Sequence, residues 1–337
     1  MLTVKEAKTR WRGVLAPIVT PFGEDGELNL DALQTNVQWL LDRGATRGNT
    51  VFLAAGSGGD FPMMNLHERQ QVITAIADVV DGKAPIIAGV QSLDIRETIA
   101  LCQHCERLGL DGVQISVPFY YDGRQGDVIA WFEEVARHTN VGFAIYNNWY
   151  TGYDMPLSLV EELLDLPNAI GVKWASPSID VFQDGVRRLL PHVAVVNNTF
   201  NTILGHLLGS RCFVSHWPNF YPEWCWRIWD LMETGQYLDA QHEFDRVMAP
   251  YQALVAQIAT QTAGEGVFVR PLMAAAGLNG GYSRLPSRDA AVTAEMHTAF
   301  RSLLAATDTA VSEIENTAID GLGARYKGAV MPHGGVS

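Results

Sequence analysis

Residues 112–146 read GVQISVPFYYDGRQGDVIAWFEEVARHTNVGFAIY and contain one complete copy of the pattern that decides the fold. Two short apolar runs, GVQIS (112–116) and GFAIY (142–146), flank the amphipathic stretch DVIAWFEEVARHT (127–139). Short continuous apolar runs are typical of parallel strands that are buried on both faces. The segment therefore predicts a strand, a covering helix and a second strand parallel to the first.

The same pattern repeats along the chain in both directions. Six further apolar runs have the length and composition of buried strands: GVLAPIV (13–19), TVFLA (50–54), PIIAGV (85–90), AIGVK (169–173), VAVVN (193–197) and CFVSH (212–216). Helical stretches such as LDALQTNVQWLLDRG (30–44) lie between them. Eight strands with intervening helices favour a closed (β/α)₈ TIM barrel over an open sheet, and such barrels commonly take roughly 250 residues.

The apolar pattern changes after the eighth predicted strand. Beyond that strand it is purely helical in three stretches: 223–263, 265–276 and 288–304. The end of the chain, GLGARYKGAVMPHGGVS, is rich in glycine and has weak periodicity. We expect a barrel with an N-terminal extension over residues 1–222, a C-terminal helical region over 223–304, and a tail or arm over 305–337.

The composition is that of an ordinary globular protein with an acidic charge balance. Of the 337 residues, 47% are hydrophobic and 18% are charged, and the formal net charge is −13. This balance argues against nucleic acid or an anionic membrane as a partner, because both require basic patches. No apolar run approaches the roughly 20 residues of a membrane-spanning helix. The N-terminal segment MLTVKEAKTRWRG lacks the apolar centre of a secretory signal, so we expect a cytoplasmic protein.

Two of the four cysteines, Cys102 and Cys105, form a C-x-x-C pair within the helical stretch IALCQHCERLG. Such pairs occur in redox and zinc sites, but no second C-x-x-C follows to complete four ligands. We expect both to be buried or half-buried helix thiols.

Polar side chains and a glycine-rich loop follow four of the predicted strands. Tyr146 ends the fifth strand, Lys173 ends the sixth, the loop GSGG (56–59) follows the second, and PFYY (118–121) follows the fourth. Active sites of α/β barrels lie at the carboxyl ends of the strands. We therefore expect these four features to converge on one mouth of the barrel.

Lys173 is the first candidate for a catalytic group. A lysine that ends the apolar run AIGVK is costly to bury unless it is neutral, paired or covalently used. A desolvated lysine is the nucleophile that condenses with carbonyl substrates, and a salt bridge at the barrel rim is the alternative. Tyr146 is either a proton donor and acceptor or an ordinary barrel tyrosine. The backbone amides of the glycine-rich loop (56–59) suit a carboxylate ligand. A phosphate is the alternative ligand, but the Gly-Lys-Ser/Thr of a P-loop does not follow.

A series of motifs, in a fixed order, carries a resemblance to a known family. They are Val19-Thr20-Pro21-Phe22 with Asp25-Gly26, Gly56 to Pro62 with Glu68-Arg69, Pro118-Phe119-Tyr120, Tyr146-Asn147, Gly171-Val172-Lys173, and Asn219 with Pro222. In these motifs, and over residues 12–304, the chain resembles the dihydrodipicolinate synthase/N-acetylneuraminate lyase family of Schiff-base-forming pyruvate aldolases. The resemblance implies a TIM barrel that acts as a lyase on a 2-oxo acid.

The resemblance also implies a role for each matching residue. Lys173 would form the imine and Tyr146 would transfer protons to the substrate. Ser57 would link Tyr146 to Tyr120, which in the family reaches in from a neighbouring subunit; this implies at least a dimer and usually a tetramer, a dimer of dimers. The substrate carboxylate would lie against the amides of Ser57 and Gly58. The resemblance implies pyruvate and an aldehyde as partners, with no metal and no organic cofactor.

The chain departs from the family's pattern at several positions. Gly58 replaces the second threonine of the family's GTTGE, and Asp60 shortens its acid. The family's arginine after the YN motif, which binds a distal carboxylate in dihydrodipicolinate synthase, has no counterpart here. The biosynthetic dihydrodipicolinate synthase activity is therefore disfavoured.

Tryptophans near the predicted mouth favour an apolar or aromatic acceptor. Trp149, Trp174 and Trp217 follow strands or lie in mouth loops, where indoles bind aromatic groups by area burial and stacking. Packing against a helix or a subunit is the alternative. We predict a similarity to hydratase-aldolases, which cleave aryl-substituted 2-oxo acids. The predicted substrate-binding residues are Gly56, Gly58, Asn148, Trp149, Val214 and Trp217.

Three other functions compete with this prediction. A dehydratase of a sugar-derived 2-keto-3-deoxy acid would use the same imine, and asparagines such as Asn147 and Asn198 favour its polar substrates. A hydrolase or metal-dependent aldolase would need clustered His, Asp or Glu at strand ends, where His216 is the one histidine. A catalytically silent barrel that only binds a 2-oxo acid is the third. We expect His67 and His216 to be structural rather than proton carriers.

Overall fold

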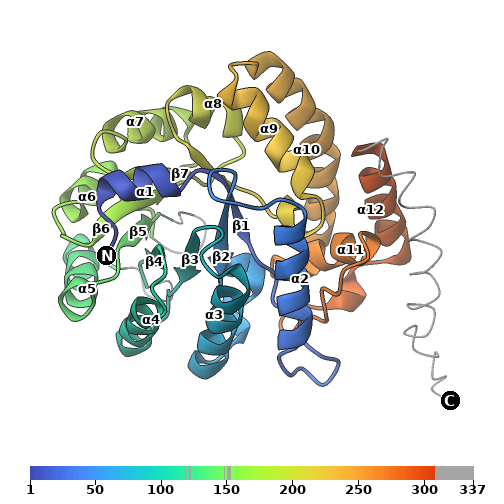
Figure 1. Cartoon of the computed structure of the whole chain (residues 1–337), viewed down its shortest axis with the longest axis horizontal. Helices are drawn as coiled ribbons and strands as arrows, with labels where there is room; N and C mark the ends of the chain where they lie inside the picture. The colour runs from blue at the N-terminus through green and yellow to red at the C-terminus, as the bar shows by residue number, and fades with distance from the viewer. Residues whose placement is uncertain (119, 121–122, 148, 150–152, 308–337) are drawn as a thin grey trace.

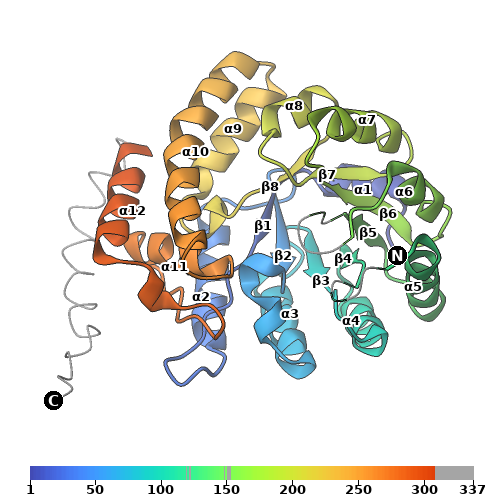
Figure 2. The same ribbon diagram turned by 180° about the vertical axis from the view of Figure 1, so that it is seen from behind.

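Eight parallel strands close into a barrel in the order of the sequence, with β8 paired back to β1 (Figures 1 and 2). The computed structural model describes residues 1–118, 120, 123–147, 149 and 153–307. The strands are β1 (Gly13–Pro17), β2 (Thr50–Ala54), β3 (Ile86–Gly89), β4 (Gly112–Ser116), β5 (Phe143–Tyr146), β6 (Ala169–Trp174), β7 (Ala194–Asn197) and β8 (Cys212–Val214). The prediction of a TIM barrel is confirmed, and each predicted strand is present.

Helices surround the barrel and continue beyond it. They are α1 (Val4–Arg10), α2 (Leu30–Asp42), α3 (Leu66–Val80), α4 (Ile95–Arg107), α5 (Gln125–His138), α6 (Leu157–Leu163), α7 (Ile179–Leu189), α8 (Thr202–Leu207), α9 (Pro222–Glu233), α10 (Tyr237–Ala259), α11 (Gly266–Ala275) and α12 (Ala294–Thr307). Their starts follow local chemistry: Asn65 caps α3 through a capping box with Glu68, and the Ser178 side chain caps α7. Their apolar faces pack on the strands, whose residues are almost all buried.

A short N-terminal helix that the strand pattern did not reveal closes one end of the barrel. Thr3 and Glu6 form a capping box that starts α1, and this T-x-x-E signature was visible in the sequence. After α1, the buried Trp11 fills the space beside Gly112 and Gly171, where a Cβ would lie 2.6 and 2.3 Å from its ring atoms. In Figure 1, α1 lies across the end of the barrel that faces the viewer.

The C-terminal helices share a hydrophobic cluster with the barrel. Val14 of β1 and Phe213 of β8 belong to the same buried cluster as Trp224 of α9, Val247 of α10 and Phe300 of α12. The helical stretch predicted over 223–263 is divided between α9 and α10, because Gly235 adopts a left-handed conformation with φ of 77°. Figures 1 and 2 show α10, α11 and α12 on one side of the barrel.

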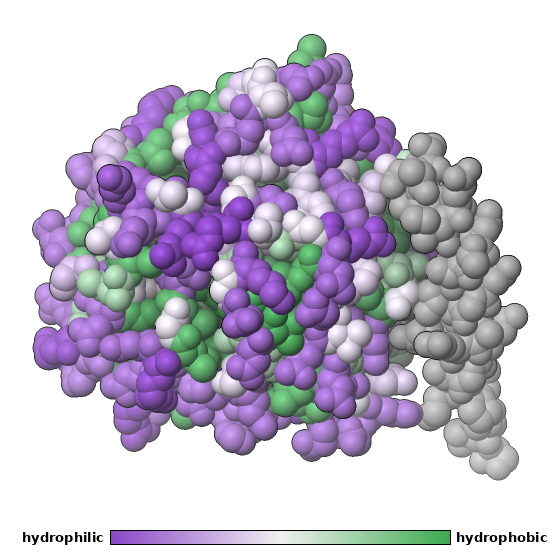
Figure 3. Space-filling model, in the orientation of Figure 1, coloured by the Kyte–Doolittle hydropathy of each residue, from purple (hydrophilic) through white to green (hydrophobic). Residues whose placement is uncertain are grey.

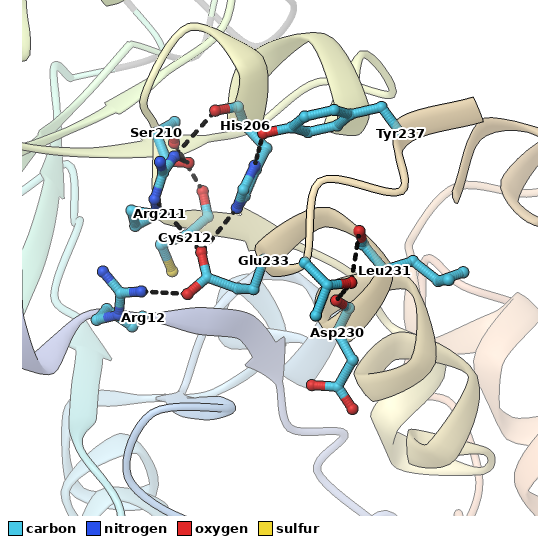
Figure 4. Close-up of polar contacts among 10 residues, drawn as sticks. Arg12, His206, Ser210, Arg211, Cys212, Asp230, Leu231, Glu233 and Tyr237 are labelled. Atoms are coloured by element: carbon cyan, nitrogen blue, oxygen red, sulfur yellow. Dashed lines mark hydrogen bonds and ion pairs between the residues drawn. The ribbon is translucent and has the colours of Figure 1, made fainter. Parts of the chain in front are cut away.

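A polar cluster ties α8, α9 and α10 to the chain just before β1 (Figure 4). Glu233 accepts hydrogen bonds from Arg12 and His206, the latter at 2.9 Å, and the other ring nitrogen of His206 lies 3.3 Å from the Tyr237 hydroxyl. Burial lowers the pKa of His206, against the effect of Glu233. Burial alone would raise the pKa of Glu233, but the hydrogen bond from His206 and the charge of Arg12 lower it. The cluster therefore holds an ionised carboxylate beside a neutral imidazole.

Cys102 and Cys105 are buried free thiols in α4, as predicted. Hydrophilic residues cover most of the face seen in Figure 1, with hydrophobic residues in separate areas between them (Figure 3). None of the helices in the described ranges is both long and apolar enough to cross a lipid bilayer.

Candidate active site

A cavity of about 510 Å³ lies at the carboxyl ends of the strands. One side of its wall is formed by residues on or next to the strands: Pro17, Leu53, Tyr146, Lys173 and Val214. The other side is formed by residues of the C-terminal helical region: Phe244, Met248, Tyr251, Glu265 and Phe268. The second group comes from α10, α11 and the residue that precedes α11. The C-terminal helical region is therefore part of the site, and the cavity has the size of a small-molecule pocket.

Lys173 lines this cavity although only 3% of the residue is exposed. Burial lowers its pKa from 10.5 to about 8, against the opposing charge of Glu265. Burial also raises the pKa of the Cys212 thiol to about 12, so this neighbour is neutral at pH 7. Within the described residues Lys173 forms no salt bridge, so the rim ion pair considered from the sequence is not found there. An appreciable fraction of its amine is neutral and nucleophilic near pH 7.

Tyr146 lies beside Lys173 because their strands are neighbours. The two residues are paired in the register of β5 and β6, and Nζ of Lys173 lies 4.0 Å from the centroid of the Tyr146 ring. Tyr146 is 2% exposed, and its hydroxyl accepts a hydrogen bond of 3.4 Å from Asn198 Nδ2, after β7. The Tyr146 ring is therefore held against the Lys173 amine, which makes Tyr146 a candidate proton carrier at this site.

The loop after β2 forms a 3₁₀ turn, η1 (Ser57–Gly59), whose first residue lines the cavity. The Gly59 amide donates to the Gly56 carbonyl and the Asp60 amide to the Ser57 carbonyl. The Ser57 and Gly58 amides donate to no backbone carbonyl among the described residues, which leaves them available for an anion. Gly56 and Gly58 themselves are not among the residues that line the cavity. A Cβ on Gly56 would lie 2.8 Å from the Leu53 side chain.

His216 and Glu265 form a pair in the cavity wall. Nε2 of His216 lies 3.0 Å from Oε2 of Glu265. Burial favours the neutral form of Glu265, but the hydrogen bond and charge of His216 and the charge of Lys173 outweigh it and lower its pKa. Glu265 is therefore an ionised carboxylate inside a largely apolar cavity.

A buried salt bridge holds the start of α11 against the loop after β2. Nη2 of Arg270 lies 2.6 Å from Oδ2 of Asp60, with the two side chains 5% and 2% exposed. Burial raises the pKa of Asp60, against the lowering effects of Arg270 and of a hydrogen bond from the Gly266 amide. Because Arg270 belongs to α11, this ion pair holds the helix that begins directly after Glu265. Asp60, the shortened acid of the loop after β2, is therefore paired with Arg270.

The three tryptophans that sequence reasoning assigned to the mouth lie in different environments. Trp149 lines the cavity and is 39% exposed. Trp217 also lines it, but is 1% exposed and packs against Trp224 with ring centroids 4.8 Å apart. Trp174 points away from the mouth: its indole donates to the Phe182 carbonyl of α7. Phe244 and other side chains of the helical region add further aromatic character to the cavity.

The other predicted residues divide between the cavity and its surroundings. Val214 lines the cavity, whereas Tyr120 is 75% exposed and does not line it. Asn148 lies outside the described residues. Within the described ranges no group of three or more His, Cys, Asp or Glu side chains is arranged to hold a metal ion.

Sequence reasoning missed Glu265 and the aromatic wall of α10 and α11. Glu265 stands in Ala263-Gly264-Glu265-Gly266, a short segment without periodicity, so no local signal marks it as a site residue. His216 was expected to be structural, yet it faces the cavity with 20% of its side chain exposed. A histidine at the end of a barrel strand was the one signal that pointed to it.

A family model and curated relatives match most of the chain. The model of the Dihydrodipicolinate synthetase family matches residues 10–307. The putative 2-dehydro-3-deoxy-D-gluconate aldolase of Escherichia coli (strain K12) is 30% identical over 240 residues, which cover 67% of this chain and 77% of that protein. The 4-hydroxy-tetrahydrodipicolinate synthase of Thermotoga petrophila is 31% identical over 172 residues. That match covers 50% of this chain and spans only 57% of the relative's own length.

Solved structures show the same fold. The crystal structure of a putative dihydrodipicolinate synthetase from Pseudomonas aeruginosa superposes with a TM-score of 0.80 at 22% identity, covering 88% of this chain and 99% of that one. At this identity the likeness supports the fold alone.

Proposed function

The chain belongs to the dihydrodipicolinate synthetase family, and we propose that it is a Schiff-base-forming carbon–carbon lyase that cleaves a 2-oxo acid into pyruvate and an aldehyde, or joins the two. The observation that carries the proposal is the environment of Lys173. Its amine is buried in a cavity at the carboxyl ends of the strands, its pKa is lowered to about 8, and a phenol lies beside it.

The chemistry follows from the two neighbouring groups. The neutral Lys173 amine attacks the 2-oxo carbon, and loss of water leaves an iminium that withdraws electrons from the adjacent bonds. A base removes the proton of the 4-hydroxyl, the C3–C4 bond breaks, and its electron pair forms the enamine of pyruvate while the aldehyde departs. We assign these proton transfers to Tyr146, because its ring lies against Nζ. Protonation at C3 and hydrolysis of the imine release pyruvate and restore the amine.

The cavity wall favours an acceptor with an apolar or aromatic part. Trp149, Phe200, Phe244, Met248 and Phe268 all line the cavity and offer area for burial and ring stacking. The ring of an aryl aldehyde would lie against this wall while its carbonyl faces the imine. The pyruvate carboxylate is assigned to the amides of Ser57 and Gly58, which have no backbone acceptor among the described residues.

Trapping with borohydride tests the proposal directly. The protein is incubated with pyruvate, and separately with 4-hydroxy-4-phenyl-2-oxobutanoate, in the presence of sodium borohydride, and the intact mass and modified peptide are determined. We expect a pyruvate-derived adduct on Lys173 that is absent from Lys173→Ala. If neither acid gives an adduct, although circular dichroism shows that the protein is folded, the proposal is contradicted.

A second copy of the chain is proposed to complete the site. Tyr120 is 75% exposed and does not line the cavity of its own chain, which is consistent with its reaching a neighbouring subunit. Mixing inactive Lys173→Ala with impaired Tyr120→Phe tests this: hybrid oligomers should contain one intact site and regain activity. Additive residual activities from the two variants would contradict the shared site.

A dehydratase of a sugar-derived 2-keto-3-deoxy acid is the second candidate. Ser176, Asn198, Thr199 and Asn201 give the cavity a polar side that would accept several hydroxyls. Assays that measure pyruvate release and 2-oxo acid dehydration on the same set of aryl and polyhydroxy substrates distinguish the two. A preference for the aryl substrates with pyruvate release supports the lyase, and water loss from polyhydroxy acids supports the dehydratase.

A further inference from the structure

Glu265 places a negative charge in a cavity that is otherwise mostly apolar. The residue directly precedes α11 and lines the cavity with 30% of its side chain exposed. Burial acts to raise its pKa, but the hydrogen bond and charge of His216 and the charge of Lys173 outweigh burial and lower it. An ionised carboxylate therefore borders the space in which the substrate is proposed to bind.

The imidazole of His216 is packed in place beside this carboxylate. Its Nε2 lies 3.0 Å from Oε2 of Glu265, and Phe268 meets the ring edge-on with centroids 5.8 Å apart. A Cβ on Gly58 would lie 2.8 Å from both Cδ2 and Nε2, so the ring packs directly on that glycine. The pair of His216 and Glu265 is net negative when the imidazole is neutral and uncharged overall when it is protonated. In neither state does the pair offer a net positive charge to a bound anion.

Positive charge is scarce in the rest of the wall. Among the described residues that line the cavity, Lys173 is the one lysine and there is no arginine. In the proposed mechanism, the positive charge of the Lys173 iminium is balanced by the carboxylate of the 2-oxo acid itself. A second carboxylate, on the acceptor part of the substrate, would have no cation to balance it and would be repelled by Glu265. Such repulsion is strong inside a cavity, where water and salt screen charges weakly.

The apolar wall increases the cost of a second charge. Phe244, Met248, Tyr251 and Phe268 line the helical side of the cavity, on which Glu265 also lies. Burial raises the pKa of Tyr251, so its phenol is neutral. Moving a carboxylate from water to a position against such side chains is costly unless the charge is paired.

We propose that Glu265 is a specificity-determining residue, which restricts this site to 2-oxo acids whose acceptor part carries no second carboxylate. The inference rests on the proposed Schiff-base function and names a substrate class for it: 2-oxo acids with a single negative charge, whose aldehyde product is uncharged. Glu265 acts through its charge and takes part in no bond-making step.

Three substrates that differ only at one position of a ring separate charge from size. They are 4-hydroxy-4-phenyl-2-oxobutanoate and its 4-carboxyphenyl and 4-carbamoylphenyl counterparts. The carbamoyl group has nearly the shape of the carboxylate but is neutral. The ratio of kcat/KM for the carboxyphenyl substrate to kcat/KM for the carbamoylphenyl substrate therefore measures the effect of the charge. In the wild type we expect this ratio to be about 0.1 or lower, since like charges about 10 Å apart at an effective dielectric constant of about 20 repel by roughly 10- to 20-fold.

Variants of the pair identify the charge that is responsible. In Glu265→Gln the ratio should rise about tenfold, while cleavage of the phenyl substrate is retained and shows that the protein is folded. Glu265→Asp keeps the charge and should keep the low ratio, as should His216→Gln, which keeps the carboxylate and removes its partner. Asp245→Asn is the matched control, because Asp245 is an exposed acid of α10 that does not line the cavity. Its ratio should equal that of the wild type.

The pH dependence of borohydride trapping gives a second measurement, which a purely structural role of Glu265 would not affect. Burial lowers the pKa of Lys173 to about 8, and the charge of Glu265 opposes this effect. Without that charge the pKa falls further. Trapping of pyruvate by Glu265→Gln should therefore level off at a lower pH than trapping by the wild type. An unchanged pH profile would overturn the inference, because no ionised carboxylate would then act on the cavity.

The outcomes distinguish this inference from the proposed function. If the wild-type protein forms no borohydride adduct with pyruvate or with the phenyl substrate, the Schiff-base function itself fails. If the adduct forms but the wild type cleaves the carboxyphenyl and carbamoylphenyl substrates equally well, the selection against a second charge is overturned. If Glu265→Gln changes kcat/KM for all three substrates by the same factor, Glu265 acts on the part that they share, and its role in specificity is likewise overturned.

Discussion

The Nζ atom of Lys173 lies 4.0 Å from the centroid of the Tyr146 ring, and the two residues are register partners on adjacent strands of the barrel. The pairing places the proposed nucleophile and the proposed proton carrier side by side without help from any loop. Because both lie on rigid strands, their relative position is set by backbone hydrogen bonds and survives changes in the surrounding loops.

Imine formation should depend on pH in the way that the lowered pKa of Lys173 dictates. With a pKa of about 8, about 9% of the amine is neutral at pH 7, against about 0.03% for an ordinary lysine. The initial rate of borohydride trapping with pyruvate should rise with pH and level off above about pH 8. A rate that keeps rising towards pH 10.5 would show that Lys173 has an unshifted pKa.

Lys173→Met should stabilise the protein while abolishing trapping. The folded-state pKa of about 8 lies below the ordinary 10.5, so the unfolded chain binds more protons between these values. The wild type therefore loses stability as pH falls through that window, by about 3 kcal/mol at pH 7. The melting temperature of the variant should exceed that of the wild type at pH 7, and the difference should shrink as pH approaches about 10. If the melting temperatures of the variant and the wild type differ equally at the two pH values, Lys173 is not a buried ammonium.

Tyr146→Phe should separate imine formation from catalysis. The phenyl ring keeps the contact with Lys173, but no hydroxyl remains to carry protons. We expect kcat for pyruvate release to fall by about 10²- to 10³-fold while the Lys173 adduct still forms. Asn198→Ala, which removes the 3.4 Å hydrogen bond to the Tyr146 hydroxyl, should have a smaller effect. A Tyr146→Phe enzyme with wild-type turnover would exclude Tyr146 as the proton carrier.

The buried pair of Asp60 and Arg270 should be strongly coupled. Arg270→Met leaves the Asp60 carboxylate buried without its partner, which costs about 3–5 kcal/mol of unfolding free energy. Adding Asp60→Asn should recover part of that loss, because the unpaired charge is then gone. Thermal unfolding of the four proteins in this double-mutant cycle provides the measurement. Additive effects of the two changes would show that the pair does not act as a unit.

Trp149→Ala should reduce the preference for aryl acceptors. Trp149 lines the cavity and is 39% exposed, so its removal should leave the fold intact. If the indole contributes about 1.4 kcal/mol of binding free energy, its loss lowers kcat/KM for an aryl substrate about tenfold. The kcat/KM for a short aliphatic substrate should stay unchanged. Equal losses for both substrates would place Trp149 in a general structural role instead.

Much of the fold was predictable because the barrel repeats one local pattern. Runs such as GFAIY and AIGVK have no polar residue before their last position, and only a strand buried on both faces suits them. The helix α1 was missed because its signal is a single capping box rather than an apolar stripe. The break at Gly235 was missed because helical periodicity continues on both sides of one left-handed residue.

The sequence by itself determined the eight-stranded barrel, the strand-end position of Lys173 and Tyr146, and the membership of a family, because these depend on local periodicity and on ordered motifs. Only the tertiary structure decided that Glu265 and His216 meet in the cavity, that Trp174 packs against α7 away from it, and that α10 and α11 form its apolar wall. The reason is the sequence separation: Glu265 lies 49 positions from His216. Contacts of that kind are set by how helices pack against the barrel, which no local pattern encodes.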